Sequence, residues 1–260
     1  MNYAAPWWLP GGNLQTIWAA LRARRCMGLS PLFRRERWTT PDSDFVDVDW
    51  LVPQASALAR TAGARQPLLV VFHGLEGSSA SHYAQAFADV AARRGWACAV
   101  PHFRGCSGEI NLAPRAYHSG DFAEIDWFLQ CFAVRHAGPV VAVGISLGGN
   151  ALMRWAGEIG AQASQAVAAV ASVCAPLDLE ASGRAIGQGF NRQVYTRMFL
   201  QSMRPKALQK LAQHPGLFDG DALLAARDLY AFDQIFTGPV HGFTGVEDYW
   251  RRASAKPHLA

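Results

Sequence analysis

The stretch from Val140 to Asn150, Val-Val-Ala-Val-Gly-Ile-Ser-Leu-Gly-Gly-Asn, decides the fold. Its β-branched, apolar first half is typical of a strand buried on both faces, and the residues after Ser146 favour a helix. Between them lies the spacing Gly144-x-Ser146-x-Gly148. In a sharp strand-to-helix turn of this kind the serine hydroxyl projects from the sheet edge, and the glycines avoid collisions with the neighbouring strand and helix. The stretch therefore predicts a nucleophilic serine at Ser146.

Two backbone N–H groups are candidates for holding a negatively charged oxygen beside this serine. The Leu147 N–H would stand at the N-terminus of the predicted helix, where the helix dipole favours an anion. The second candidate is the Leu75 N–H, in the loop that follows Val71-Phe72-His73-Gly74. We interpret His73 and Gly74 as residues that shape this loop. In proteins with this serine turn the catalytic histidine follows the serine in the sequence, whereas His73 precedes Ser146.

Strand and helix patterns alternate along the chain up to residue 176. Buried strands are expected at 68–72, 96–101, 140–144 and 167–173, helices at 81–94, 119–136 and 147–159, a hairpin at 36–40 and 45–52, and a loop at 54–66. This alternation predicts the α/β class, with a doubly wound and mostly parallel sheet. Residues 180–236 show helical patterns, broken by Pro205 and Pro215, and no strand pattern. We expect them to form a helical cap over the active site.

The length of 260 residues fits a single domain with one insertion. We expect a core at 1–175 with an N-terminal extension at 1–35, a helical cap at 176–245, and a return segment to the core at 246–260. Five large side chains of the cap have spacings that suit either the lining of the cleft or the cap's own core. They are Phe190, Tyr195, Met198, Phe199 and Met203.

Composition excludes several classes of function. The net charge of +4 is spread thinly, without the Lys/Arg block that is typical of nucleic-acid binding. The densest basic stretch contains Arg22, Arg24, Arg25, Arg34, Arg35 and Arg37. We interpret it as a solvated face, with an anionic or membrane-surface contact as the alternative. The five cysteines follow no metal-binding spacing and predict free thiols. Without a secretory signal or an apolar run long enough for a transmembrane helix, we expect a cytoplasmic protein without a metal site.

Further motifs along the chain resemble those of the YheT-like branch of the α/β-hydrolases. They are residues 6–16 (PWWLPGGNLQT), 73–79 (HGLEGSS), 102–109 (HFRGCSGE), 117–121 (YHSGD), 187–192 (GQGFNR) and 249–254 (YWRRAS). The resemblance implies esterase chemistry on a small-molecule carboxylic ester, including lipid or short-chain esters, with no cofactor. It gives no expectation for the oligomeric state.

The catalytic acid and base are not assigned by the sequence. In this fold an acid and then a histidine follow the serine, and the resemblance implies that both come after two further strands. We therefore expect a C-terminally truncated chain whose last strands are missing. Asp178 and His241 are weak candidates, with the alternatives of a cap-entry turn and cap packing, and His258 is expected in a disordered tail.

Three functions remain open at this point. The first is a serine carboxylesterase that forms an acyl-enzyme on Ser146. The second is a non-catalytic protein of the same fold that binds acyl or lipid ligands, which active-site titration would reveal. The third is acyl transfer to an alcohol or amine, which only product analysis separates from hydrolysis.

Overall fold

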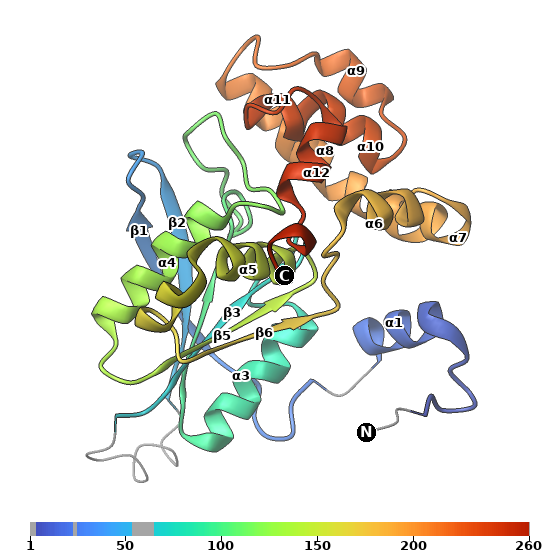
Figure 1. The fold of residues 1–260 in the computed structure, drawn as a ribbon. Coiled ribbons are helices and arrows are strands. Elements are labelled where there is room, and N and C mark those ends of the chain that lie inside the picture. Colours follow the sequence, from blue (N-terminus) through green and yellow to red (C-terminus); the bar gives the residue numbers. More distant parts are fainter. Residues whose placement is uncertain (1–3, 23–24, 54–64, 260) are drawn as a thin grey trace.

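A six-stranded sheet forms the centre of the molecule. The computed structural model describes residues 4–22, 25–53 and 65–259, so the loop expected at 54–66 lies almost wholly outside the described residues. The strands are β1 (Phe33–Thr39), β2 (Phe45–Leu51), β3 (Leu68–Phe72), β4 (Ala97–Pro101), β5 (Val140–Ile145) and β6 (Ala169–Val173). Their order is β1-β2-β4-β3-β5-β6. The β1–β2 hairpin is antiparallel, as is the pairing of β2 with β4, and β4, β3, β5 and β6 run parallel (Figure 1). The predicted hairpin and parallel sheet are confirmed.

Helices cover both faces of this sheet. The helix α3 (His82–Arg94) packs on one face, and α4 (Phe122–Arg135) and α5 (Leu147–Ile159) pack on the other (Figure 1). Alternate residues of β3 divide between the two interfaces: Val71 contacts the α3 side, whereas Val70 and Phe72 belong to the core under α4 and α5. A strand buried on both faces needs apolar residues at every position, which is why β3 reads as a continuous apolar run.

The strand β5 lies between β3 and β6 in the sheet. Phe72 at the end of β3 pairs with Gly144, and Gly144 pairs in turn with Ser172 of β6. Since these strands are parallel, their carboxyl ends meet at one edge, where loops of α/β folds build their sites. This register sets the loop after β3 beside the turn after β5.

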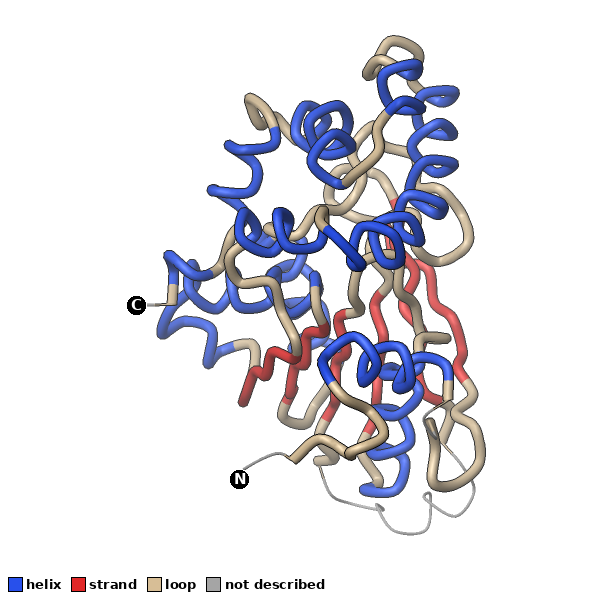
Figure 2. Tube along the Cα trace, turned by 90° about the vertical axis from the view of Figure 1, so that its right-hand side faces the viewer, coloured by secondary structure: helices blue, strands red, loops and turns tan. Residues whose placement is uncertain are grey.

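Residues 176–245, called the cap below, lie above the carboxyl edge of the sheet (Figures 1 and 2). Their described residues form helices joined by turns and loops, and none of them is in a strand. The elements of the cap are α6 (Leu179–Ile186), α7 (Gly189–Asn191), a π-helical turn (Arg192–Thr196), α8 (Arg197–Gln213), α9 (Gly220–Ala225), α10 (Leu229–Phe232), a second π-helical turn (Asp233–Thr237) and α11 (Gly238–Val240). The expected break at Pro205 is wrong, because α8 continues through it. Leu200 and Ala207 bury against the rest of the cap on either side of this proline. We attribute the continuity to this packing, which outweighs the local preference.

The chain returns to the core through α12 (Val246–Ala253) and a short 3₁₀ helix (Lys256–His258). The amide of Asn150 on α5 holds this return: its Nδ2 donates to the carbonyls of Ser119 (2.8 Å) and Ala253 (2.9 Å), and its Oδ1 accepts from the Ala255 N–H (3.0 Å). The expectation of a disordered tail at His258 is wrong. A Cβ on Gly157 of α5 would lie 2.3 Å from the His258 carbonyl oxygen, so the tail packs tightly on that helix.

The N-terminal extension forms a helix that the sequence did not predict, α1 (Gly11–Leu21). None of its residues is buried, and the Tyr195 hydroxyl of the cap donates to its Asn13 Oδ1 at 3.1 Å. Among the described helices, none has both the length and the hydropathy needed to cross a membrane. All five cysteines are free thiols, as predicted.

Candidate active site

Ser146 adopts a backbone conformation that is rare for a residue with a side chain. Its φ is 52° and its ψ is −117°, so the surrounding structure must hold the turn against local preference. The Ser146 N–H donates to the Val173 carbonyl at 2.9 Å, and its own carbonyl accepts from the Asn150 N–H at 3.1 Å. Both backbone groups are thus engaged, while the side chain lines a cavity under the cap.

Two glycines allow three backbone segments to meet at this turn. A Cβ on Gly144 would lie 2.4 Å from the Gly148 carbonyl oxygen, and a Cβ on Gly148 would lie 2.5 Å from that of His73. Neither contact is sterically possible, so both positions require glycine. The close approach brings the loop after β3 against Ser146: a Cβ on Gly74 would lie 3.2 Å from the Ser146 Cβ.

His73 connects two loops and is fully buried. Its Nδ1 lies 2.8 Å from the Gly74 carbonyl oxygen, and its Nε2 accepts from the Phe103 N–H at 3.1 Å. Burial lowers the pKa of His73 to about 3, so the ring is neutral, with its proton on Nδ1 where it can donate to Gly74. Since both ring nitrogens are occupied, neither is available to Ser146.

The two candidate oxyanion donors lie on the walls of the same cavity as Ser146. Leu147 is the first residue of α5, where N–H groups have no acceptor within the helix. Leu75 follows the Gly74 turn, and no acceptor among the described residues takes its N–H. An anion beside Ser146 could therefore be met by N–H groups from two separate elements.

Glu76 joins the loop after β3 to the cap, a link that the sequence did not predict. Its backbone has a φ of 58°, and its N–H donates to the Tyr117 hydroxyl at 3.0 Å. The same hydroxyl donates to Glu76 Oε1 at 2.8 Å, and Lys206 Nζ of α8 forms an ion pair with Oε2 at 2.9 Å. The residue next to Leu75 is thereby fixed from both the core and the cap.

The cavity has a volume of about 360 Å³ and lies between the sheet edge and the cap. Its cap side is largely apolar, with Ile186, Phe199, Met203, Leu229, Phe232 and Phe236 among its lining residues. Of the five cap residues considered from the sequence, Phe199 and Met203 line it. Phe190 and Met198 are exposed, and Tyr195 faces Asn13 of α1. The π-helical turn at Arg192–Thr196 adds a residue to one turn, so the helical spacing assumed across it does not hold.

One carboxyl group stands within this apolar half. Asp233 lines the cavity at the start of the second π-helical turn, and its Oδ2 accepts from Trp250 Nε1 at 2.9 Å. Burial raises its pKa to about 6, against the opposing effect of hydrogen bonds from Thr237 and Trp250. The sequence near Asp233 does not indicate that this carboxyl group is buried in the cavity wall, because its partner Trp250 comes from the return segment.

The two weak candidates for the acid and base lie apart from Ser146, and neither lines its cavity. Asp178 caps α6 by accepting from the Ala181 N–H at 3.0 Å, and it pairs with Lys256 at 3.1 Å. The two ring nitrogens of His241 face the carbonyl oxygens of Thr237 (2.7 Å) and Ala116 (3.0 Å). Among the described residues, the Ser146 hydroxyl has no hydrogen-bonded histidine, so the triad acid and base stay unassigned.

A family model for the alpha/beta hydrolase fold matches residues 67–233, which include β3, the turn at Ser146 and most of the cap. The chain belongs to the α/β-hydrolase family. The Escherichia coli (strain K12) protein named "Putative esterase YheT" is 40% identical to this hydrolase over 251 residues, 95% of this chain and 70% of that protein. The human "Phospholipase ABHD3" is 25% identical over 87% of this chain.

The hydrolase spans only 55% of the length of the human phospholipase. Among solved structures, the Pyrococcus furiosus esterase Pf2001 matches it with a TM-score of 0.49 and 16% identity, over 69% of this chain and 66% of that one.

Proposed function

We propose that this hydrolase acts on carboxylic esters through an acyl-enzyme on Ser146, with residues 176–245 as its cap. One observation carries the proposal: a serine with a φ of 52° stands at a strand-to-helix turn and lines a cavity together with Leu75 and Leu147. In this arrangement the Ser146 oxygen would attack the ester carbonyl and lose its proton. The ester C–O bond would then break, the alcohol would leave with that proton, and water would hydrolyse the acyl-enzyme to the carboxylic acid and free Ser146. The N–H groups of Leu75 and Leu147 would stabilise the tetrahedral oxyanion, and His73, Gly74, Gly144 and Gly148 would maintain the geometry.

The lining of the cavity supports an ester with an apolar acyl chain as the substrate class. Phe199, Met203 and Phe236 offer apolar contacts on the cap side, while Glu76 and Lys206 form a polar wall near Leu75. A largely apolar pocket with few convergent polar groups is typical of small-molecule sites. The named esterase and phospholipase relatives are consistent with this class.

The test is covalent labelling of the full chain with a fluorophosphonate, followed by intact mass measurement. We expect one adduct, which Ser146→Ala abolishes. Ser182→Ala is the matched control, because Ser182 lines the same cavity on α6 and should leave labelling unchanged. Labelling that persists in Ser146→Ala would refute the assignment of the nucleophile.

A second candidate function is binding of an acyl or lipid ligand without turnover. It is favoured by the lack of a hydrogen-bonded histidine at Ser146 among the described residues. Removing the general base of a serine hydrolase typically costs several orders of magnitude in rate. Steady release of p-nitrophenol from a short-chain ester would favour the esterase, and acyl transfer would appear as a new ester or amide when an alcohol or amine is added. Fatty-acid binding with neither labelling nor turnover would favour the second candidate.

A further inference from the structure

Charge is distributed very unevenly along this chain. Residues 1–35 contain five arginines and no acidic residue, and residues 181–218 contain six lysines and arginines and again no acidic residue. These two stretches hold 11 of the 24 basic residues and none of the 20 acidic ones. The fold brings them together, because Tyr195 of the cap binds Asn13 of α1, and α1 lies beneath α6 and α7 (Figure 1).

Some of these cations are neutralised within the protein, and others are not. Arg34, Arg35, Arg184 and Lys206 form ion pairs with carboxylates, and Arg204 and Lys210 bind carbonyl oxygens. Arg22, Arg25, Arg192 and Arg197 are exposed, and none forms an ion pair within the described residues; Arg24 lies outside them. The adjoining segments therefore keep at least four solvent-facing guanidinium groups.

The same region exposes an unusual amount of apolar surface. Of the 17 large apolar side chains that are exposed among the described residues, eight lie between residues 7 and 32. Trp7 is 91% exposed and Leu21 is 71% exposed, and Trp18 is exposed on α1. Phe190 and Met198 are also exposed, on the cap segment that Tyr195 links to α1. A concentration of exposed apolar side chains in one part of a protein is typical of an interaction site.

We propose that this basic and aromatic face, represented by Trp7, Trp18, Leu21, Arg22, Arg192 and Arg197, docks on an anionic lipid bilayer. Tryptophan side chains favour the bilayer interface, and guanidinium groups are attracted to anionic headgroups. A helix that buries no residue in the protein but carries exposed tryptophan and leucine beside arginines suits a position in the interface plane. A nucleic acid would match the arginines but would leave the aliphatic side chains without a partner.

The segment that carries this face also contributes to the wall of the cavity, so docking would bring the cavity close to the bilayer. Met198 is exposed on α8, one residue after Arg197, while Phe199 and Met203 of the same helix line the cavity. A protein held to a bilayer through this segment would have its apolar pocket wall beside a source of lipophilic esters. The docking itself needs no reaction at Ser146, so its test stands or falls separately from the proposed function.

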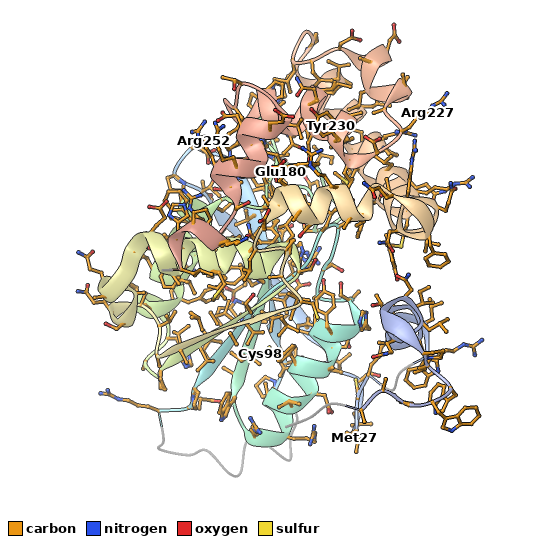
Figure 3. The ribbon with its side chains drawn as sticks, turned by 45° about the vertical axis from the view of Figure 1, so that its right-hand side comes forward. Met27, Cys98, Glu180, Arg227, Tyr230 and Arg252 are labelled. Atoms are coloured by element: carbon orange, nitrogen blue, oxygen red, sulfur yellow. The ribbon has the colours of Figure 1, made fainter. Side chains whose placement is uncertain are left out.

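The experiment is flotation of the full chain with phosphatidylcholine vesicles, with and without about 30% phosphatidylglycerol. We expect binding to the anionic vesicles, with a loss of at least about tenfold when salt rises from about 0.1 M to about 0.5 M. Arg192→Gln with Arg197→Gln should lower the partition coefficient by about 25-fold, at about fivefold for each arginine. The control, Arg251→Gln with Arg252→Gln, removes the same charge from α12. Arg252 lies on the opposite side of the molecule from α1 (Figure 3), so the control should change binding by less than about twofold.

A second pair of variants tests the apolar contribution. Trp7→Ser with Leu21→Ser should lower binding at least about tenfold, whereas Leu112→Ser with Val134→Ser, at exposed positions outside the face, should not lower it. Thermal melting checks that each variant is folded. Equal binding to neutral vesicles, equal losses in the control variants, or tighter binding of single-stranded RNA than of vesicles would overturn the proposal. So would a dimer in the absence of vesicles that Trp7→Ser with Leu21→Ser dissociates, because the face would then bind a second copy.

Discussion

Lys206 of the cap helix α8 forms a 2.9 Å ion pair with Glu76, the residue that follows Leu75 beside Ser146. The two residues are separated by 130 positions in the sequence. The carboxylate of Glu76 is mostly buried and has the Tyr117 hydroxyl as its other partner at 2.8 Å. The cap therefore contacts the proposed oxyanion loop directly, and a change in one should be felt by the other.

Lys206→Met should destabilise the protein and slow the labelling of Ser146. The substitution leaves a mostly buried carboxylate without its cation, which should lower the free energy of unfolding by about 1–3 kcal/mol. Labelling should slow by about tenfold because Leu75 loses its fixed neighbour. Chemical denaturation and labelling rates measure the two effects. Adding Glu76→Gln should restore part of the stability. Arg184→Gln, which breaks the exposed pair with Glu180, should leave the stability nearly unchanged, because solvent screens exposed ion pairs. Equal losses in Lys206→Met and Arg184→Gln would contradict the link.

Gly148→Ala should disrupt the turn at Ser146. The added Cβ would collide with the His73 carbonyl oxygen at 2.5 Å, so α5 or the loop after β3 must move, at a cost of about 1–3 kcal/mol. Labelling should fall at least about tenfold, in line with the sensitivity of catalytic geometry to small displacements. Gly12→Ala in α1 is the control, because nothing lies within 4 Å of its added Cβ, and it should stabilise the helix by up to about 1 kcal/mol. Unchanged labelling in Gly148→Ala would show that the close packing is not needed.

Asp233→Asn should stabilise the protein increasingly as pH rises. Burial raises the pKa of Asp233 to about 6 in the folded protein from 3.8. Between these two pKa values the folded state binds more protons than the unfolded state. The contribution of Asp233 to the free energy of unfolding therefore falls as pH rises. The variant should be more stable than the wild type above pH 6, by at most about 3 kcal/mol, and the difference should vanish near pH 4. Urea denaturation across this range measures it.

Asp248→Asn provides a control of opposite sign for that experiment. The hydrogen bond from Arg252 lowers the pKa of the partly buried Asp248, so its ionised form contributes stability that is lost as pH falls through the folded pKa. Asp248→Asn should therefore be less stable than the wild type at neutral pH. If both variants shifted stability in the same direction at neutral pH, the burial of Asp233 would not be the cause.

His241→Gln should leave the labelling rate of Ser146 within about twofold of the wild type. Its ring nitrogens face the carbonyls of Thr237 and Ala116 rather than the cavity, so the expected loss is about 1 kcal/mol of stability. His136→Gln is the matched control, because His136 Nε2 likewise faces a carbonyl, that of Gln66, at 2.7 Å. A selective loss of labelling in folded His241→Gln would instead identify His241 as the base.

The sheet and the turn at Ser146 could be predicted because their signals are local. The β-branched run of β5 and the glycines at 144 and 148 lie within a few residues of the serine they position. The hairpin of β1 and β2 follows from alternation on either side of a short turn. In each case the residues that determine the structure are neighbours in the chain.

The cap and the walls of the cavity could not be predicted in the same way. The π-helical turn at Arg192–Thr196 changes which side chains face inward. No residue type in this stretch predicts such a turn. The partners of Lys206 and Asp233 come from segments far along the chain, through packing that local patterns do not encode. The helix α1 was not predicted because none of its residues is buried. Its apolar residues therefore do not show the helical period that packing against a core produces.

The side-chain amide of Asn150 has a consequence for how the molecule unfolds. It connects α5 at Ser146 with the loop before α4, through Ser119, and with the returning chain at Ala253 and Ala255. If the loop before α4 or the returning chain separated from α5, the buried Asn150 amide and several backbone groups would lose their hydrogen-bond partners, which would be costly. Heat should therefore melt the cap and the sheet in one cooperative transition rather than two, and the turn at Ser146 should remain intact until the whole structure is lost.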